Sequence, residues 1–306
     1  MEICIHTEPT QRGADYNTLR ALAQATEEAG FDGFFRSDHY LQFGTPVRPA
    51  AASDAWISLA GLARDTERVR LGTLVTPVTF RSPVQLAVHV AQVDQMSGGR
   101  IELGIGGGWY QAEFEAAAVP FPATDRMARL EEAADIIAGI WGTEPGETFG
   151  YEGRRYQVKG AQAAAETVQR PGPPLIVGGS GGARSLALAV RHAAEYNAPF
   201  IAPQEAADLR ARLAEDAEAA GRETAPRVSV LNTVCCGKDD AHISARADVL
   251  GEPLKAESFR GTPGRLVDLF GQYAEAGVSR LYLRMLDMED LSHLELLADD
   301  VLPQLR

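Results

Sequence analysis

The 306-residue sequence contains few lysines, few cysteines and no long apolar run. Its lysines are Lys159, Lys238 and Lys255. Chemistry that needs a Schiff-base lysine therefore has three candidates at most. The cysteines are Cys4 and the adjacent pair Cys235 and Cys236, and sequence neighbours rarely form a disulfide. We therefore expect no disulfide framework, which is typical of a reducing cytoplasm.

Positive charge is also scarce. Lysine and arginine together number 29 against 42 aspartates and glutamates, which gives a net charge of −13. No basic run interrupts this excess, so the composition disfavours nucleic acid and anionic membrane surfaces as partners. The N-terminus, Met1–His6, shows no basic region followed by an apolar stretch, and no apolar run is long enough to span a bilayer. We expect a cytoplasmic protein without membrane contact.

Short apolar runs alternate with longer helical patterns along the whole chain, which is typical of βαβ units and a parallel sheet. The candidate strands are Glu2–His6, Gly33–Ser37, Val69–Thr76, Arg100–Gly104, Leu175–Gly178, Glu195–Pro199, Val228–Val234 and Arg280–Met285. Eight is the number of strands that closes a TIM barrel. The predicted fold class is therefore α/β, a (β/α)8 barrel with insertions.

The segments between these strands carry apolar residues at the spacing typical of helices. The candidate helices are Tyr16–Ala29, Ala55–Asp65, Val84–Met96, Arg126–Ile140, Ala183–Ala193, Glu205–Ala220, Arg265–Ala276 and Leu291–Leu302. Gly30, Gly98 and Gly277 each follow such a helix, where a C-cap needs a left-handed residue.

No linker or low-complexity tract is visible, so we predict one domain over residues 1–306. Insertions are expected around 106–124, 143–174 and 241–261, and long ordered loops of this kind are usually functional. The second insertion alternates around Glu152 and Gly153 like a small hairpin, which could cover either barrel helices or a substrate. The third is polar and is expected to be helical, with no assigned chemistry.

Three common barrel chemistries find little support. Metal-dependent hydrolysis normally shows His-x-His or His-Glu-x-x-His, and the six histidines form neither pattern, so no metal is expected. Imine formation has only Lys238 near a strand end. Glycosidase chemistry needs paired carboxylates, which Glu8, Asp38 and Glu113 could supply by coincidence in any barrel.

With these three chemistries set aside, the best candidate for a site is a set of glycine-rich segments at the carboxyl ends of the predicted strands, where barrel enzymes act. Gly104–Trp109 follows the fourth strand, and Gly178–Gly182 lies between an apolar strand and a helix. Glycine lets a backbone approach a flat ring or a phosphate closely, and helix amides attract phosphate. These residues indicate a cofactor, although a flexible turn is the structural alternative for the second motif. His39, after the second strand, is the best titratable candidate.

Four segments together resemble the luciferase-like monooxygenase superfamily, and within it the oxidoreductases that use the deazaflavin coenzyme F420. The segments are Phe34–Tyr40, Leu71–Pro83, Asp94–Trp109 and Pro174–Gly179, and the resemblance extends to Leu294–Pro303. It covers essentially the whole chain.

The resemblance implies a barrel that holds a flavin or deazaflavin ring over its mouth. It places a bulge with a non-proline cis peptide in the third strand, at Thr73–Leu74. It assigns catalysis to His39, with Glu113 assisting proton transfer and Trp109 walling the substrate cavity. Structural alternatives are a capping partner, a surface carboxylate and a core tryptophan, respectively. The implied cofactor-binding residues are Asp38, Thr73, Leu74, Thr76, Gly106, Gly107, Gly178, Gly179, Ser180, Gly181 and Gly182.

Three functions remain open from the sequence. The preferred one is hydride transfer between coenzyme F420 and a small organic substrate, since a deazaflavin carries hydride and hardly activates oxygen. The second is an FMN-dependent monooxygenase that receives reduced flavin from a separate reductase. The third is a non-catalytic flavin-binding relative. Arg184 is the nearest cation to the glycine loop, with Arg154, Arg155 and Lys159 available if the insertion folds over it. Helices rich in alanine and leucine favour a homo-oligomer such as a homodimer.

Overall fold

Eight parallel strands close into a barrel in the computed structural model, which describes residues 1–42, 51–163, 166–250 and 253–305. In order around the barrel they are β1 (Glu2–Thr7), β2 (Gly33–Arg36), β3 (Arg70–Pro77), β4 (Ile101–Gly106), β7 (Leu175–Gly178), β8 (Glu195–Pro199), β9 (Arg227–Cys236) and β11 (Arg280–Arg284). The barrel is closed because β1 pairs in parallel with both β2 and β11. The predicted α/β barrel is confirmed.

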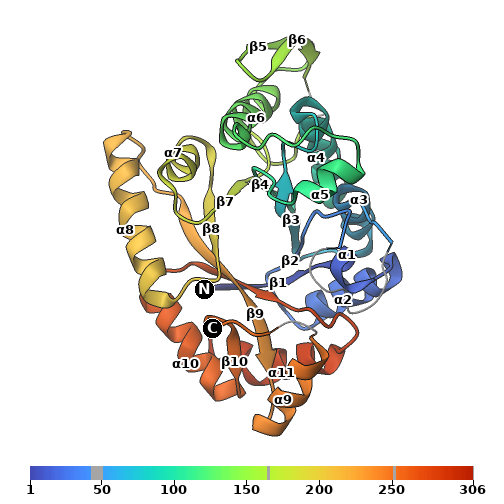
Figure 1. Cartoon of the computed structure of the whole chain (residues 1–306), viewed down its shortest axis with the longest axis vertical. Coiled ribbons are helices and arrows are strands. Elements are labelled where there is room, and N and C mark those ends of the chain that lie inside the picture. Colours follow the sequence, from blue (N-terminus) through green and yellow to red (C-terminus); the bar gives the residue numbers. More distant parts are fainter. Residues whose placement is uncertain (43–50, 164–165, 251–252, 306) are drawn as a thin grey trace.

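Helices surround the barrel (Figure 1). The long ones are α2 (Tyr16–Glu28), α3 (Ala55–Asp65), α4 (Pro83–Ser97), α6 (Arg126–Trp141), α7 (Ala183–His192), α8 (Pro203–Ala219), α10 (Pro263–Glu275) and α11 (Leu291–Asp300). They match the predicted helices within a few residues. Gly30, Gly98 and Gly277 have φ angles of 82°, 69° and 81°, which confirms the left-handed helix exits.

Shorter elements occupy the loops. They are α1 (Pro9–Arg12), α5 (Gln111–Ala116), β5 (Thr148–Glu152), β6 (Gln157–Gln162), α9 (Asp240–Val249), β10 (Phe259–Gly261) and a 3₁₀ turn, η1 (Leu302–Gln304). β5 and β6 form the predicted antiparallel hairpin, which projects from the barrel beyond α6 (Figure 1). Residues 164–165 and 251–252, within two of the predicted insertions, lie outside the described residues.

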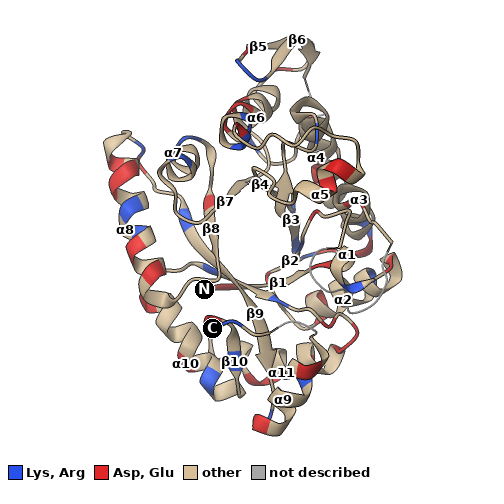
Figure 2. Cartoon of the chain, viewed as in Figure 1, with Lys and Arg blue, Asp and Glu red and all other residues tan. Residues whose placement is uncertain are grey.

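Side chains fill the barrel in layers because alternate strand residues point inward. At the amino ends of the strands, Arg280 and Glu102 pair at 2.6 Å with 1% of each side chain exposed. An apolar layer above them includes Phe35, Ile176 and Leu231. The helices carry many of the acidic residues, as on α8 (Figure 2). These layers fill the barrel at the amino ends of its strands. The carboxyl ends of the strands are therefore where a site can form.

The third strand departs from regular pairing. Its register with β4 shifts between Thr73 and Thr76, which confirms the expected bulge. The non-proline cis peptide joins Leu74 to Val75, so the expected position at Thr73–Leu74 was wrong by one residue. The pairing through Thr73 stays regular, and the irregular stretch begins after it.

Candidate active site

A cavity of about 910 Å³ opens at the carboxyl ends of the strands. The predicted site residues that line it are His39, Leu74, Gly106, Gly107, Trp109, Glu113, Gly178, Gly179 and Ser180. Those that are absent from its lining are Asp38, Thr73, Thr76, Gly181 and Gly182. Residues far apart in the sequence meet here because parallel strands end at the same edge of the barrel.

His39 and Glu113 form a hydrogen-bonded pair on this wall. His39 follows β2, Glu113 lies on α5, and the distance from Nδ1 to Oε2 is 3.1 Å. The other carboxylate oxygen accepts the main-chain N–H groups of Tyr40 and Leu41. Burial alone would raise the pKa of Glu113, but these hydrogen bonds and the charge of His39 outweigh it and lower that pKa. Glu113 is therefore an ionised, buried acceptor, with only 2% exposed.

Trp109 lies beside this pair. Its ring meets the His39 imidazole edge-on, with centroids 6.0 Å apart, and packs against Tyr110. Trp109 lines the cavity yet is 58% exposed. It is therefore a rim residue rather than a core tryptophan, as Glu113 is a buried rather than a surface carboxylate.

The glycines of β4 and β7 allow the bulge of β3 to pack inside the barrel. A Cβ on Gly106 or Gly178 would come within 2.7 Å or 2.9 Å of the Val75 methyl groups. A Cβ on Gly104 would stand 2.2 Å from the Thr73 carbonyl oxygen. Leu74, Val75 and these glycines thus form a wall from which few side chains project, and such a wall suits a flat ligand.

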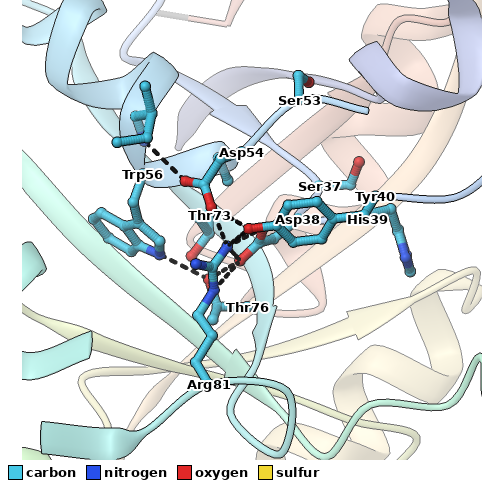
Figure 3. Close-up of polar contacts among 12 residues, drawn as sticks. Ser37, Asp38, His39, Tyr40, Ser53, Asp54, Trp56, Thr73, Thr76 and Arg81 are labelled. Atoms are coloured by element: carbon cyan, nitrogen blue, oxygen red, sulfur yellow. Dashed lines mark hydrogen bonds and ion pairs between the residues drawn. The ribbon is translucent and has the colours of Figure 1, made fainter. Parts of the chain in front are cut away.

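Three of the predicted cofactor-binding residues form hydrogen bonds with other parts of the barrel: Asp38, Thr73 and Thr76. Asp38 accepts from the guanidinium of Arg81 at 2.8 Å and from the Thr76 hydroxyl at 2.9 Å (Figure 3). The Thr73 hydroxyl donates to the Gly104 carbonyl oxygen at 3.1 Å. Their predicted contact with a cofactor stays a prediction, while their observed partners connect strands and loops.

The glycine loop before α7 contributes Gly178, Gly179 and Ser180 to the cavity. Gly181 donates its N–H to the Tyr196 hydroxyl, and Gly182 begins the helix without a side-chain cap. Arg184 forms an ion pair with Glu131 at 2.8 Å. Neither it nor the hairpin cations line the cavity. Among the residues that the structure describes, the cations that do are Arg126, Lys255 and Arg284. The insertion that carries Lys255, to which the sequence assigned no chemistry, therefore contributes to the site.

The sequence assigned no role in the preferred function to the wall at the ends of β1 and β11, although it offered Glu8 there as a possible glycosidase carboxylate. His6, Glu8 and Arg284 line the cavity, and Arg284 Nε donates to Glu8 Oε1 at 2.7 Å. Burial lowers the pKa of His6 to about 4, so its imidazole is neutral, and its Nε2 lies 3.2 Å from the Leu74 carbonyl oxygen. The alternation of Cys4 and His6 along β1, continued by Glu8 directly after the strand, was the signal that could have found this wall.

Within the described ranges, no group of three or more histidine, cysteine or acidic residues could hold a metal ion. None of the helices described is both long and apolar enough to cross a membrane.

The family model for luciferase-like monooxygenases matches residues 1–298. The chain belongs to this family. Among curated relatives, an F420-dependent glucose-6-phosphate dehydrogenase of Microbacterium testaceum is 36% identical over 181 residues, which are 59% of this chain and 52% of the relative. A flavin-dependent trigonelline monooxygenase, oxygenase component, of Acinetobacter baylyi is 28% identical over 162 residues, 53% of this chain and 42% of that protein. These two matches span about half of each relative.

One relative matches along its length. The F420-dependent glucose-6-phosphate dehydrogenase of Nocardia farcinica is 27% identical and 93% of each chain is covered. Among solved structures, an F420-dependent secondary alcohol dehydrogenase superposes with a TM-score of 0.83 at 16% identity, covering 100% of this chain and 99% of that one. The monooxygenase RslO1 of Streptomyces bottropensis gives 0.81 at 20% identity with both chains fully covered. The structural likeness shows the fold, and the relatives use either F420 or a flavin.

Proposed function

We propose that the protein is an oxidoreductase that transfers hydride between coenzyme F420 and a small organic substrate. The observation that carries the proposal is the His39–Glu113 pair at 3.1 Å on the wall of the cavity. An imidazole oriented by a buried carboxylate is the acid–base group that an alcohol or an unsaturated substrate needs. Relatives named as F420-dependent dehydrogenases support the cofactor.

The residues present fit a deazaflavin ring. The cavity volume of about 910 Å³ leaves room for a tricyclic ring and a small substrate together. Leu74, Val75 and the neighbouring glycines would support the ring face. Buried polar atoms without a partner, His6 Nδ1, Glu8 Oε2 and Ser37 Oγ, belong to side chains of the cavity wall. Unpaired buried polar groups cost about 1–3 kcal/mol each, so a polar ligand or water at this wall is favoured.

Charge at the cavity also supports an anionic cofactor. Although the chain carries a net −13, the described residues that line the cavity include the cations Arg126, Lys255 and Arg284 beside the carboxylates Glu8 and Glu113. The N-terminus of α7 adds main-chain N–H groups beside Gly178–Ser180. Among the described residues, the cavity lining therefore carries more cationic than anionic side chains, unlike the chain as a whole.

The chain's own residues would orient the substrate and move one proton. A bound deazaflavin would supply a ring carbon that accepts or gives hydride. Because ionised Glu113 can only accept a hydrogen bond, Nδ1 of His39 carries the proton of that pair. Nε2 is then the atom that takes a proton from, or gives one to, the substrate oxygen. Trp109, Phe200 and Leu231 would exclude water from the reacting atoms.

Titration of the apoprotein with each cofactor tests the proposal. We expect tight binding of F420, followed by substrate-dependent oxidation or reduction of its chromophore across a panel of alcohols, ketones and enones. Tight binding of FMN with no binding of F420 would overturn it and favour an FMN-dependent monooxygenase, which would then consume oxygen with reduced FMN. Binding of either ring without turnover would favour a non-catalytic relative.

Replacement of His39 tests the catalytic assignment. His39→Ala should reduce turnover by about 10²- to 10⁴-fold, the usual contribution of a general acid or base, while the cofactor Kd changes little. His242→Ala is the matched control, because His242 lies exposed on α9 and pairs with Asp239, which directly precedes that helix. A variant that keeps wild-type turnover would remove His39 from the mechanism.

A further inference from the structure

Arg81 contacts both sequence neighbours of His39, although it is absent from the cavity lining (Figure 3). Its Nη2 lies 2.8 Å from Asp38 Oδ1 and 2.9 Å from the Tyr40 hydroxyl oxygen. Its Nε lies 3.2 Å from the second oxygen of Asp38. One guanidinium therefore holds the chain immediately before and immediately after the imidazole, which itself points away from this network (Figure 3).

A second carboxylate completes the network. Asp54 begins α3 by accepting the Ile57 N–H at 2.9 Å, and it accepts from Arg81 Nη2 at the same distance. The Tyr40 hydroxyl donates to Asp54 and accepts from Arg81. Burial, with the hydrogen bond to Asp54, raises the pKa of Tyr40, so the phenol stays protonated and keeps this donor role.

The network also reaches the strand that forms the cavity wall. Asp38 Oδ2 accepts from the Thr76 hydroxyl at 2.9 Å, and Thr76 accepts from the Trp56 indole N–H at 3.1 Å. Thr76 directly follows Val75 of the bulge. The segment around His39 is thus fixed relative to β3, on which a cofactor ring would rest.

The contacts that Arg81 makes with Asp38, Tyr40 and Asp54 depend on the shape of its guanidinium group. The side chains of Asp38 and Arg81 are 0% and 15% exposed, so water does little to replace a lost contact. Nε and Nη2 of Arg81 engage both oxygens of Asp38 while Nη2 also reaches Tyr40 and Asp54. A lysine ammonium is a point charge on a flexible stem and cannot reproduce this fork.

We propose that Arg81 is a positioning residue, which sets the place of the His39 imidazole relative to the cofactor-bearing wall of the cavity. The inference rests on the proposed function. A misplacement of about 1 Å can cost about 10²-fold in rate, so the effect should fall on kcat. Binding of cofactor should be spared, since Arg81 does not line the cavity.

Arg81→Met and Arg81→Lys test the proposal, with Arg100→Met as the matched control. Arg100 is also an arginine bound to its surroundings through hydrogen bonds, to Thr66 Oγ1 at 3.0 Å and to the Ala63 carbonyl oxygen at 2.8 Å, but it lies at the opposite end of the barrel, just before β4. All variants are assayed as full-length protein for kcat, substrate KM, cofactor Kd and the pH profile. Nitrogen NMR of labelled histidine reports the His39 ring in the apoprotein without any turnover.

We expect both Arg81 variants to lower kcat by about 10²-fold with cofactor Kd changed by less than about threefold. Their pH profile and His39 NMR signals should shift, while Arg100→Met leaves both unchanged. Unchanged His39 signals in the Arg81 variants, full rescue by lysine, or an equal kcat loss in Arg100→Met would each overturn the proposal. Absence of turnover in wild-type protein would instead defeat the proposed function, and the NMR comparison would still decide the role of Arg81.

Discussion

Removal of the Glu113 charge perturbs the central contact of the site with little change in shape. Glu113→Gln keeps the side-chain volume and one acceptor oxygen, which can still serve the N–H of Leu41 at 3.0 Å. The new NH2 group can only donate, and it would face His39 Nδ1, where the carboxylate oxygen now lies at 3.1 Å. The variant therefore favours the imidazole tautomer with the proton on Nε2 and removes the negative charge beside Nδ1.

The size of the effect follows from the hydrogen bond that is lost. A hydrogen bond to a charged group contributes about 1.5–3 kcal/mol, and each 1.36 kcal/mol is a tenfold change, so kcat/KM should fall by about 10- to 150-fold. The upper part of this range applies because Glu113 and His39 side chains are only 3% and 17% exposed. Solvent therefore screens their interaction weakly.

The assay is kcat/KM against pH, with F420 and a substrate found by the panel. Glu115→Gln is the matched control, since Glu115 lies exposed on the same helix and its carboxylate accepts only from Gln111 among the contacts described. Circular dichroism confirms that both variants are folded. A Glu113→Gln enzyme with unchanged kcat/KM and pH profile, or a loss equal to that of Glu115→Gln, would refute the role of the pair.

Four further substitutions give predictions about the stability of the scaffold. Glu102→Gln should lower the free energy of unfolding by about 3 kcal/mol in urea titration because it leaves Arg280 buried without one of its carboxylates, and a loss below about 1 kcal/mol would contradict this. Burial lowers the pKa of His293 from 6.5 to about 4, so the unfolded chain binds a proton that the folded chain does not; stability should fall as pH drops through this window, and less so in His293→Gln. Gly104→Ala should destabilise the fold and weaken cofactor binding, because its Cβ would stand 2.2 Å from a carbonyl oxygen. Gly271→Ala, in a helix with nothing near, should stabilise by about 0.5–1 kcal/mol in the same titration.

Much of the barrel could be predicted because local patterns carry it. The run Glu2–His6 alternates along a strand, and the left-handed exits at Gly30, Gly98 and Gly277 repeat a local backbone requirement. Strand ends were less certain, as in β9, which extends to Cys236. Its last residues pair with β10, a strand that the sequence did not predict. Such pairing depends on a distant segment and leaves no local signal.

The site was predicted in part. His39 and Trp109 lie in segments that resemble the family, and Glu113 follows the second of these segments. The structure brings the three side chains together at one wall of the cavity. Lys255 was not assigned to the cavity, because only the folding of an insertion brings it there.

The sequence by itself determined the alternation of strands and helices, the glycine-rich strand ends and the candidate acid–base histidine, because each depends on neighbouring residues. The tertiary structure alone decided that Asp38 binds Arg81 and Thr76 instead of lining the cavity, and that Gly106 and Gly178 make room for Val75. These relations depend on which side chains meet once the barrel closes, and no pattern along the chain encodes such distances.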